Sequence, residues 1–222
     1  MKNFWLSAIS LFLVLSNVES QNIRFGVIAS PLISYFKTDL STIDPNGSRV
    51  GINVGLMMDK FFADHYAFST GLSLQTMGGH LNYVAGKDNF HSSANISSLP
   101  VNTDVKYKLQ YLHIPFAIKM RTTEIGYLTY FVQMGLDPMI NVKANADISS
   151  LGLTNIGVGD EIQLFYMAYH IGAGTEYKII GNTKLLIGLT YMNGFTDVTS
   201  NYGNSAEKTK MHCFELRVGA IF

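Results

Sequence analysis

The chain has 222 residues, with 14% charged side chains and a formal net charge of zero at neutral pH. An ordinary soluble protein carries roughly 25% charged residues, and phosphate binding needs clustered Lys and Arg, so nucleic acid is not expected as a partner. The single cysteine, Cys213, excludes an internal disulfide framework and a cysteine-built zinc site. We expect no metal and no cofactor, and we interpret Cys213 as a packing residue.

Residues 1–20 have the pattern of an export signal. A short basic region precedes an apolar run that ends at Leu15, and Ser20 offers a small residue for cleavage. The run is shorter than the ~20 residues that span a bilayer core. We therefore expect residues 1–20 to be removed and residues 21–222 to form one domain. No later apolar run is long enough for a spanning helix, which leaves a soluble exported β-protein or an outer-membrane barrel.

Eight segments after the signal alternate between apolar and small or polar residues, the period of a β-strand. The expected strands are 22–36, 50–62, 66–78, 107–121, 127–140, 161–179, 183–195 and 210–222. Long polar loops (37–49, 79–106, 141–160 and 196–209) alternate with short turns. This asymmetry is typical of bacterial outer-membrane barrels. The pattern predicts an all-β protein: an eight-stranded antiparallel up-and-down transmembrane β-barrel, with short periplasmic turns and longer external loops.

The last expected strand has two clearly different faces. Its apolar row includes Phe214, Leu216, Val218 and Phe222. The other row carries a charged pair, Glu215 and Arg217. We expect this strand to close the barrel and to act as the insertion signal that the barrel-assembly machinery reads.

The composition of the two rows indicates which one faces lipid. The less apolar row contains Gly, Ser, Thr and Asn with scattered charges, whereas a soluble barrel would place dense Lys and Glu on its outside. Aromatic residues also gather near the strand ends, as in interfacial girdles. We therefore expect the apolar row to face outer-membrane lipid. The alternative is a soluble lipocalin-like barrel with a hydrophobic ligand inside, which has the opposite orientation.

Charges inside such a lumen must pair, because an isolated buried charge is unfavourable. We predict a structural network in the periplasmic half, drawn from Arg24, Asp59, Lys119, Glu176 and Arg217. A proton or ion path is the less favoured interpretation of these residues. An eight-stranded barrel is filled by its own side chains, which argues against a porin. A small-solute transporter stays as an alternative that requires an open lumen.

The chain has no GxSxG, HExxH, Walker or CxxC signature, so we predict that it is not an enzyme. The alternative is an enzyme at the outer rim of the barrel. Its candidate residues are His80, His91, His113, His170, Asp104 and Asp137. By their position in the alternation, His113 and His170 face the lumen, where we expect them to be hydrogen-bonded interior residues.

Residues 111–119, YLHIPFAIK, resemble the Y-x-x-I-P-hydrophobic-x-hydrophobic-K strand of the outer-membrane β-barrel family of Bacteroidetes, often labelled PorT-type. The segments GINVG at 51–55 and TGL at 70–72, and the terminal Phe222, agree with it. The resemblance implies an outer-membrane barrel of about eight strands, and some members are linked to a secretion system that exports gliding and protease cargo. His113 stands where the family often has an acidic residue. Pro115 removes a ladder hydrogen bond, so we predict a bulge or kink there.

These patterns together predict a monomer anchored in the bacterial outer membrane with a structural or interaction role. Residues 79–106, the longest expected loop, would be the contact surface for a partner. A role as an accessory to protein secretion or envelope assembly, bound to other envelope proteins, is the second hypothesis.

Overall fold

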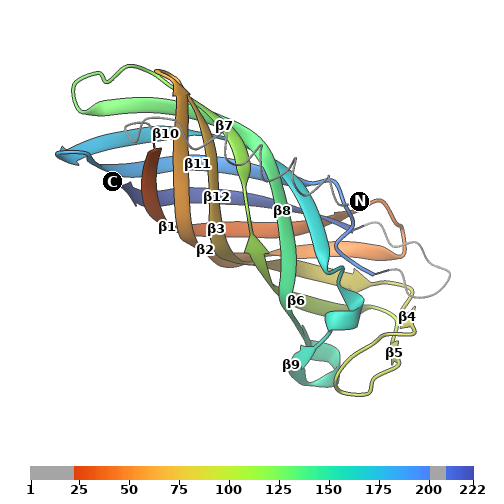
Figure 1. Cartoon of the computed structure of the whole chain (residues 1–222). Coiled ribbons are helices and arrows are strands. Elements are labelled where there is room, and N and C mark those ends of the chain that lie inside the picture. Colours follow the sequence, from red (N-terminus) through yellow and green to blue (C-terminus); the bar gives the residue numbers. More distant parts are fainter. Residues whose placement is uncertain (1–22, 201–208) are drawn as a thin grey trace, which may run out of the picture.

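A computed structural model describes residues 23–200 and 209–222, which form a β-barrel (Figure 1). Its main strands are β1 (Ile23–Thr38), β2 (Ile43–Ala63), β3 (Tyr66–Tyr83), β6 (Thr103–His113), β7 (Phe116–Arg121), β8 (Leu128–Ile148), β10 (Phe165–Ile180), β11 (Thr183–Gly194) and β12 (Thr209–Ile221). In the described part of the chain, no helix is both long and apolar enough to cross a membrane. The expected signal at residues 1–20 lies outside the described residues.

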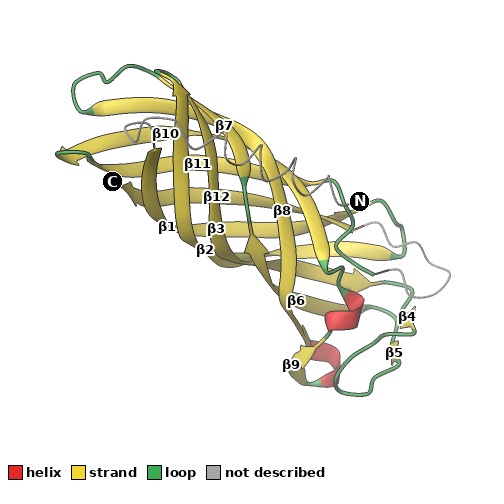
Figure 2. Cartoon of the chain, in the orientation of Figure 1, coloured by secondary structure: helices red, strands yellow, loops and turns green. Residues whose placement is uncertain are grey.

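The barrel is a closed ring of eight antiparallel strands. β6 and β7 are two halves of one strand, since both pair with β3 on one side and β8 on the other. The ring closes because β12 pairs with β1 and β10 pairs with β8. Strands dominate the whole molecule, as Figure 2 shows. The predicted fold class is confirmed.

Each strand presents one row to the lumen and the other to the outside. On β12, Phe214 and Leu216 are exposed on the outer surface, while Glu215 and Arg217 are buried in the lumen. The same alternation holds around the ring, where the exposed side chains of the lower barrel are Val, Ile, Leu, Met, Phe and Tyr. This apolar belt is the surface that a bilayer covers, and the expected orientation of the two rows is confirmed there.

The polarity of both rows reverses along the strands. On β6, Lys106 and Lys108 point outward while Tyr107 and Leu109 are fully buried. Beyond Gln110 the outward row becomes apolar, and Lys119 on β7 is buried in the lumen. The upper barrel is therefore built like a soluble protein, apolar inside and polar outside, and the lower barrel is built for lipid. The reversal marks the outer boundary of the membrane.

This reversal explains why three expected loops are too long. β2 starts at Ile43, β3 continues to Tyr83 and β8 continues to Ile148, all within stretches predicted to be loops. The predicted strands were defined by an apolar outward row. That row ends at the membrane boundary, whereas the strands continue beyond it. As a result, β1 and β2 are joined by residues 39–42 alone, so the expected strict alternation of long loops and short turns is wrong at this connection.

The strand that contains Pro115 is interrupted as expected, but not by a bulge. β6 ends at His113 and β7 begins at Phe116, and Ile114 still donates its amide hydrogen to the Pro138 carbonyl at 3.1 Å. The pairing register is the same on both sides of the gap. The ladder is therefore broken at the proline without an inserted residue. The nearby register shift falls opposite Gln110 and Tyr111, on the β8 side of the pair.

The external connections fold into a cap over one end of the barrel, away from the β10–β11 turn (Figure 1). The cap contains β4 (Lys87–Asp88), β5 (Ser98–Leu99), β9 (Leu153–Gly157) and the single-turn helices η3 (Ser149–Leu151) and η4 (Gly159–Glu161). Because η4 and the residues after it belong to this cap, β10 starts at Phe165 rather than at the expected residue 161.

Candidate functional site

The lower lumen contains a compact ion cluster centred on Lys119. Its Nζ lies 2.7 Å from Asp59 Oδ2 and 2.5 Å from Glu176 Oε1, and all three side chains are at most 1% exposed. Ser69 donates a hydrogen bond to the second oxygen of Asp59 at 2.6 Å. The ammonium also lies 4.6 Å from the centre of the Phe131 ring, a cation–π distance. One buried cation therefore neutralises part of two buried carboxylates from opposite sides of the barrel.

The structure brings together four of the five residues predicted for this network. Arg24 Nη1 lies 3.7 Å from Glu176 Oε2, and Lys184, which the prediction omitted, lies 3.9 Å from the same atom. Arg217 forms no ion pair with any residue in the described ranges, and its buried Nε lacks a hydrogen-bond partner there. It lines a separate small cavity at mid-barrel instead.

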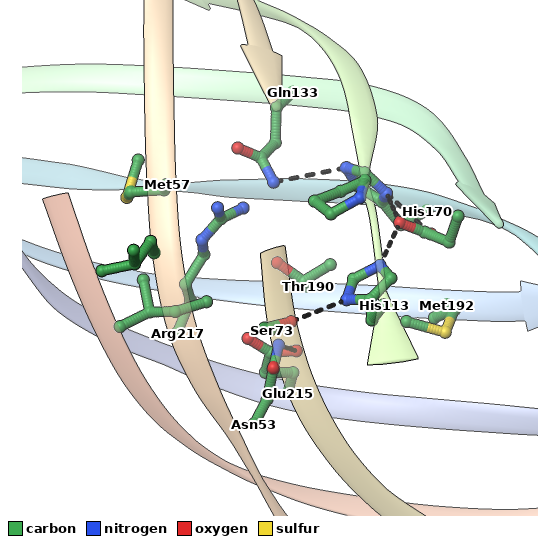
Figure 3. A pocket seen from close by; sticks show the side chains of 14 residues that line it. Asn53, Met57, Ser73, His113, Gln133, His170, Thr190, Met192, Glu215 and Arg217 are labelled. Atoms are coloured by element: carbon green, nitrogen blue, oxygen red, sulfur yellow. Dashed lines mark hydrogen bonds and ion pairs between the residues drawn. The ribbon is translucent and has the colours of Figure 1, made fainter. Parts of the chain in front are cut away.

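That cavity contains a second cluster, in which one carboxylate joins two imidazoles (Figure 3). Asp137 Oδ1 lies 2.8 Å from His113 Nε2, and its Oδ2 lies 2.8 Å from His170 Nδ1. Ser73 Oγ is 3.2 Å from His113 Nδ1, and Gln133 Nε2 is 3.3 Å from His170 Nε2. The cluster is thus continuous from β3 across β6 and β8 to β10.

The hydrogen bonds of this cluster can all be formed with both imidazoles neutral. A carboxylate can only accept, so both imidazoles donate an N–H to Asp137. The other nitrogen of each neutral ring then accepts, from the Ser73 hydroxyl at His113 and from the Gln133 amide at His170. Two histidines therefore hold one buried carboxylate by hydrogen bonds.

Register explains why these side chains meet. Gly135 on β8 is the partner of His170 on β10, and His113 is the partner of Met139 on β8. Asp137 lies between those two positions on β8 and points to the same side, so it lies between both histidines. The expectation that His113 and His170 are hydrogen-bonded interior residues is confirmed. Their convergence on Asp137 was not predicted, because strand register is a property of the assembled sheet.

The room beside this cluster is small. The centre of a water molecule can reach about 30 Å³ of the cavity, enough for about two waters. Glu215 accepts a hydrogen bond from the Asn53 amide at 3.2 Å on the same wall. Within the described residues, no group of three His, Cys, Asp or Glu side chains is placed to hold a metal ion. The cavity fits water and excludes an organic substrate.

Above the cavity the lumen is packed with apolar and aromatic side chains. Tyr111 and Tyr166 are fully buried with ring centres 5.9 Å apart, and Tyr166 Oη donates to the Met211 carbonyl at 2.8 Å. Higher up, the hydroxyls of Tyr83 and Tyr107 are 2.8 Å apart. Cys213 is buried in the same core, which agrees with its expected packing role.

The two sides of the cap are joined by a buried carboxylate that was not predicted from the sequence. Glu161 is fully buried, with Oε2 2.6 Å from Lys87 Nζ and Oε1 accepting the backbone N–H of His91 at 2.6 Å. Phe90 and Val158 from the two sides of the cap are buried in the same apolar core as the upper barrel. The remaining candidates, His80 and Asp104, form a 3.1 Å pair on the outer face of β3 and β6.

An eight-stranded ring with an apolar outer belt and a charged, closed lumen is the architecture of a transmembrane barrel of the bacterial outer membrane. The comparison with protein families agrees: residues 17–200 match the family described as "Outer membrane protein beta-barrel domain". The chain belongs to this family, and it is a protein of the bacterial outer membrane. The alternative of a soluble lipocalin-like barrel is therefore wrong.

Several solved structures have a similar chain path at low sequence identity. Neisserial surface protein A (NspA) is 13% identical, with 89% of this chain and 95% of that chain covered and a TM-score of 0.48. For Ail of Yersinia pestis the identity is 15%, the coverage 91% and 100%, and the TM-score 0.43. For OprG of Pseudomonas aeruginosa these values are 12%, 90% and 95%, and 0.49. No curated protein matches the chain.

Proposed function

We propose that this protein is a closed outer-membrane anchor whose folded external cap is the contact surface for a partner. The observation that carries the proposal is the filled upper barrel. Its lumen is packed by buried Tyr, Met, Leu and Val side chains, and the cap closes over it. The buried ion pair between Lys87 and Glu161 orders the external connections. The cap therefore presents a defined surface rather than flexible loops.

A small-solute transporter is the weaker candidate because transport needs a route. The polar lower lumen leads only to the cavity beside His113, and Tyr111 and Tyr166 fill the section above it. The ion cluster around Lys119 fills the section below. We propose a structural role for that cluster, as a plug that makes the lower barrel rigid.

An enzyme is also a weaker candidate than a closed anchor. Ser73, His113 and Asp137 do have the contacts of a nucleophile, a base and an orienting acid. Ser73 is buried inside the barrel, and the adjoining cavity has room only for water-sized molecules. A hydrolase needs its nucleophile within reach of substrate, and this serine is enclosed on all sides by strands. We propose that the cluster stabilises the barrel and does not catalyse a reaction.

Two measurements test the proposal. The purified protein reconstituted in a planar lipid bilayer is expected to give no conductance steps, with an open porin as the positive control. Steps at the frequency of the porin would support a channel and contradict the closed barrel. In cells, a photo-crosslinking amino acid at Ser93 or Thr154, both exposed on the cap, is expected to give a discrete protein adduct. The same probe at Val132 on the lipid belt is the control.

The resemblance of residues 111–119 to the PorT-type strand supports a finer assignment, which we propose: a Bacteroidetes-type barrel that is an accessory to secretion or envelope assembly. Three of the marked positions of the motif have a physical role here, since Tyr111 packs in the core, Pro115 breaks the ladder and Lys119 centres the ion cluster. A crosslinker at Asn182, on the exposed β10–β11 turn, tests for a periplasmic partner.

We further propose that the protein is a monomer in lipid and that β12 with its terminal Phe222 is read by the barrel-assembly machinery. Phe214, Leu216 and Phe222 stand on the outer surface of β12, available before lipid covers them. Replacing Phe222 by Ser is expected to lower the amount of folded protein in the outer membrane, measured by the fraction of compact barrel in unheated gel samples. Unchanged insertion would contradict this role.

A further inference from the structure

Two lysines occupy directly opposite positions on neighbouring strands, just above the lipid belt. Lys37 on β1 is the register partner of Lys210 on β12. Like charges in such a cross-strand pair destabilise a sheet. Neither ammonium has an ion-pair or hydrogen-bond partner among residues 23–200 and 209–222, in contrast to Lys108, which pairs with Asp147. Two neighbouring cations without a partner among the described residues are a ready acceptor for an anion.

An aromatic shelf lies directly below the two lysines. The His212 ring is stacked against Tyr35, with centres 5.2 Å apart, and against Tyr191 at 6.1 Å. Tyr191 Oη lies 2.8 Å from His212 Nδ1, and the buried Nε2 of the same ring has no hydrogen-bond partner among the described residues. The ring is therefore held in place by two stacking contacts and one hydrogen bond, which gives the shelf a fixed surface.

The third part of the surface is apolar and belongs to the membrane belt. Ile33 on β1 and Phe214 on β12 follow below the shelf and are exposed. Along the barrel wall the order is therefore two cations, then a stacked aromatic layer, then aliphatic and aromatic side chains. A membrane lipid presents the complementary order of anionic headgroup, interface and acyl chain.

We propose that Lys37, Lys210 and the Tyr35–His212–Tyr191 stack form a binding site for a phosphate-bearing lipid headgroup of the outer leaflet. The phosphate oxygens accept hydrogen bonds from both ammonium groups, which removes the repulsion between them. The stack lies against the headgroup at the interface, and the acyl chains follow the apolar wall next to Ile33 and Phe214. This site is on the outer surface of the barrel and is separate from the cap.

The test uses the full protein in detergent and counts retained lipid by native mass spectrometry. The probes are lipid A with both phosphates and the same lipid A after dephosphorylation. Wild-type protein is expected to retain the phosphorylated form. The double variant Lys37→Gln/Lys210→Gln is expected to bind it at least about tenfold more weakly, because two charge-assisted hydrogen bonds are lost.

The matched control is Lys106→Gln/Lys108→Gln, which removes two outward lysines above the belt on β6, beside Asp147. It is expected to bind as wild type, and Lys37→Arg/Lys210→Arg is expected to restore binding. The gel mobility of unheated samples shows whether each variant is folded. Equal affinity of the Lys37/Lys210 glutamine variant and wild type would overturn the site, as would equal binding of the two lipid forms. Complete displacement by inorganic phosphate in large excess would assign the site to free phosphate and overturn the lipid.

Discussion

Lys119 is the residue on which the charge balance of the lower lumen depends. Its ammonium contacts Asp59 and Glu176 in surroundings without water access. Replacing it by Met keeps the length of the side chain but leaves two buried carboxylates without their main partner. The free energy of unfolding is expected to fall by about 3–5 kcal/mol, the usual effect of breaking a buried ion pair. A shift of the urea midpoint in detergent or lipid vesicles measures this.

Lys178 is the matched control for that prediction. It pairs with Glu124 at the periplasmic end, but its side chain is 40% exposed. Removing an exposed ion pair changes stability by less than about 1 kcal/mol. Lys178→Gln should therefore unfold close to wild type. If both variants shifted the midpoint equally, the buried cluster would have no special role in stability.

Asp147 makes the outer face of the upper barrel sensitive to acid. Burial raises the pKa of this carboxyl, but the ion pair with Lys108 and the N–H of Asn155 outweigh it, so the pKa is lowered below its ordinary value. A lowered carboxyl pKa gives stability that is present above the unfolded-state pKa and is lost as pH falls through the folded-state pKa. Amide protection of β9 should therefore decrease in acid, measured by hydrogen exchange. In Asp147→Asn the protection should already be low at neutral pH and should lose its acid dependence.

At this scale the sequence predicts the row on which a residue lies, and therefore that His113, His170 and Lys119 are interior. It does not predict distances between strands. Arg217 has the same signature as Lys119, a charge on the lumen row, yet the two belong to different sites because Arg217 lies higher in the barrel, opposite Gly188 of β11, whereas Lys184 at the start of β11 reaches the ion cluster. Glu161 was missed because it lies in the cap, where alternation gives no information.

Among the elements, the interrupted strand β6–β7 allows a direct test. The gap at Pro115 keeps register, so a residue with an N–H at this position faces β3 opposite Gly71. Pro115→Ala should restore a ladder hydrogen bond, and the new amide should exchange slowly. The unfolding free energy should change by less than about 1 kcal/mol, because the added hydrogen bond is offset by greater freedom of the unfolded chain. Fast exchange of the new amide in this variant would show that the break has another cause.

The strands of the lower barrel were predictable because lipid on one side and a filled lumen on the other impose strict alternation. The upper ends of these strands were not predictable, because near Gln110 the outward row changes from apolar to polar and the inward row from polar to apolar. A prediction based on outward apolar residues ends the strand at that point. If the inward row is taken as the apolar one, residues 103–111 show an equally regular alternation, with Val105, Tyr107 and Leu109 buried. The strand continues across the membrane boundary, where its surroundings change from lipid to water.

For the whole molecule, the closed ring predicts resistance to detergent. Every edge in the ring is paired, including β12 with β1, so no exposed ladder is available for unfolding to begin. Purified protein should migrate faster on gels when unheated than after boiling. The double variant Tyr111→Ala/Tyr166→Ala, which removes a pair of fully buried, packed tyrosines from the lumen, should lose the compact band at a lower temperature. Identical mobility before and after boiling would contradict a closed barrel.

The reversal of polarity also determines which substitutions the chain tolerates over time. Below the boundary on β6–β7, an outward position such as Ile118 accepts any large apolar residue and a charge there is harmful, whereas above it Lys106 can exchange freely with other polar residues. Inward positions follow the opposite pattern, with polar residues tolerated below the membrane boundary and apolar residues above it. Related chains should therefore show two substitution patterns within single strands, and the height at which one pattern replaces the other would record the bilayer thickness for which each chain was selected.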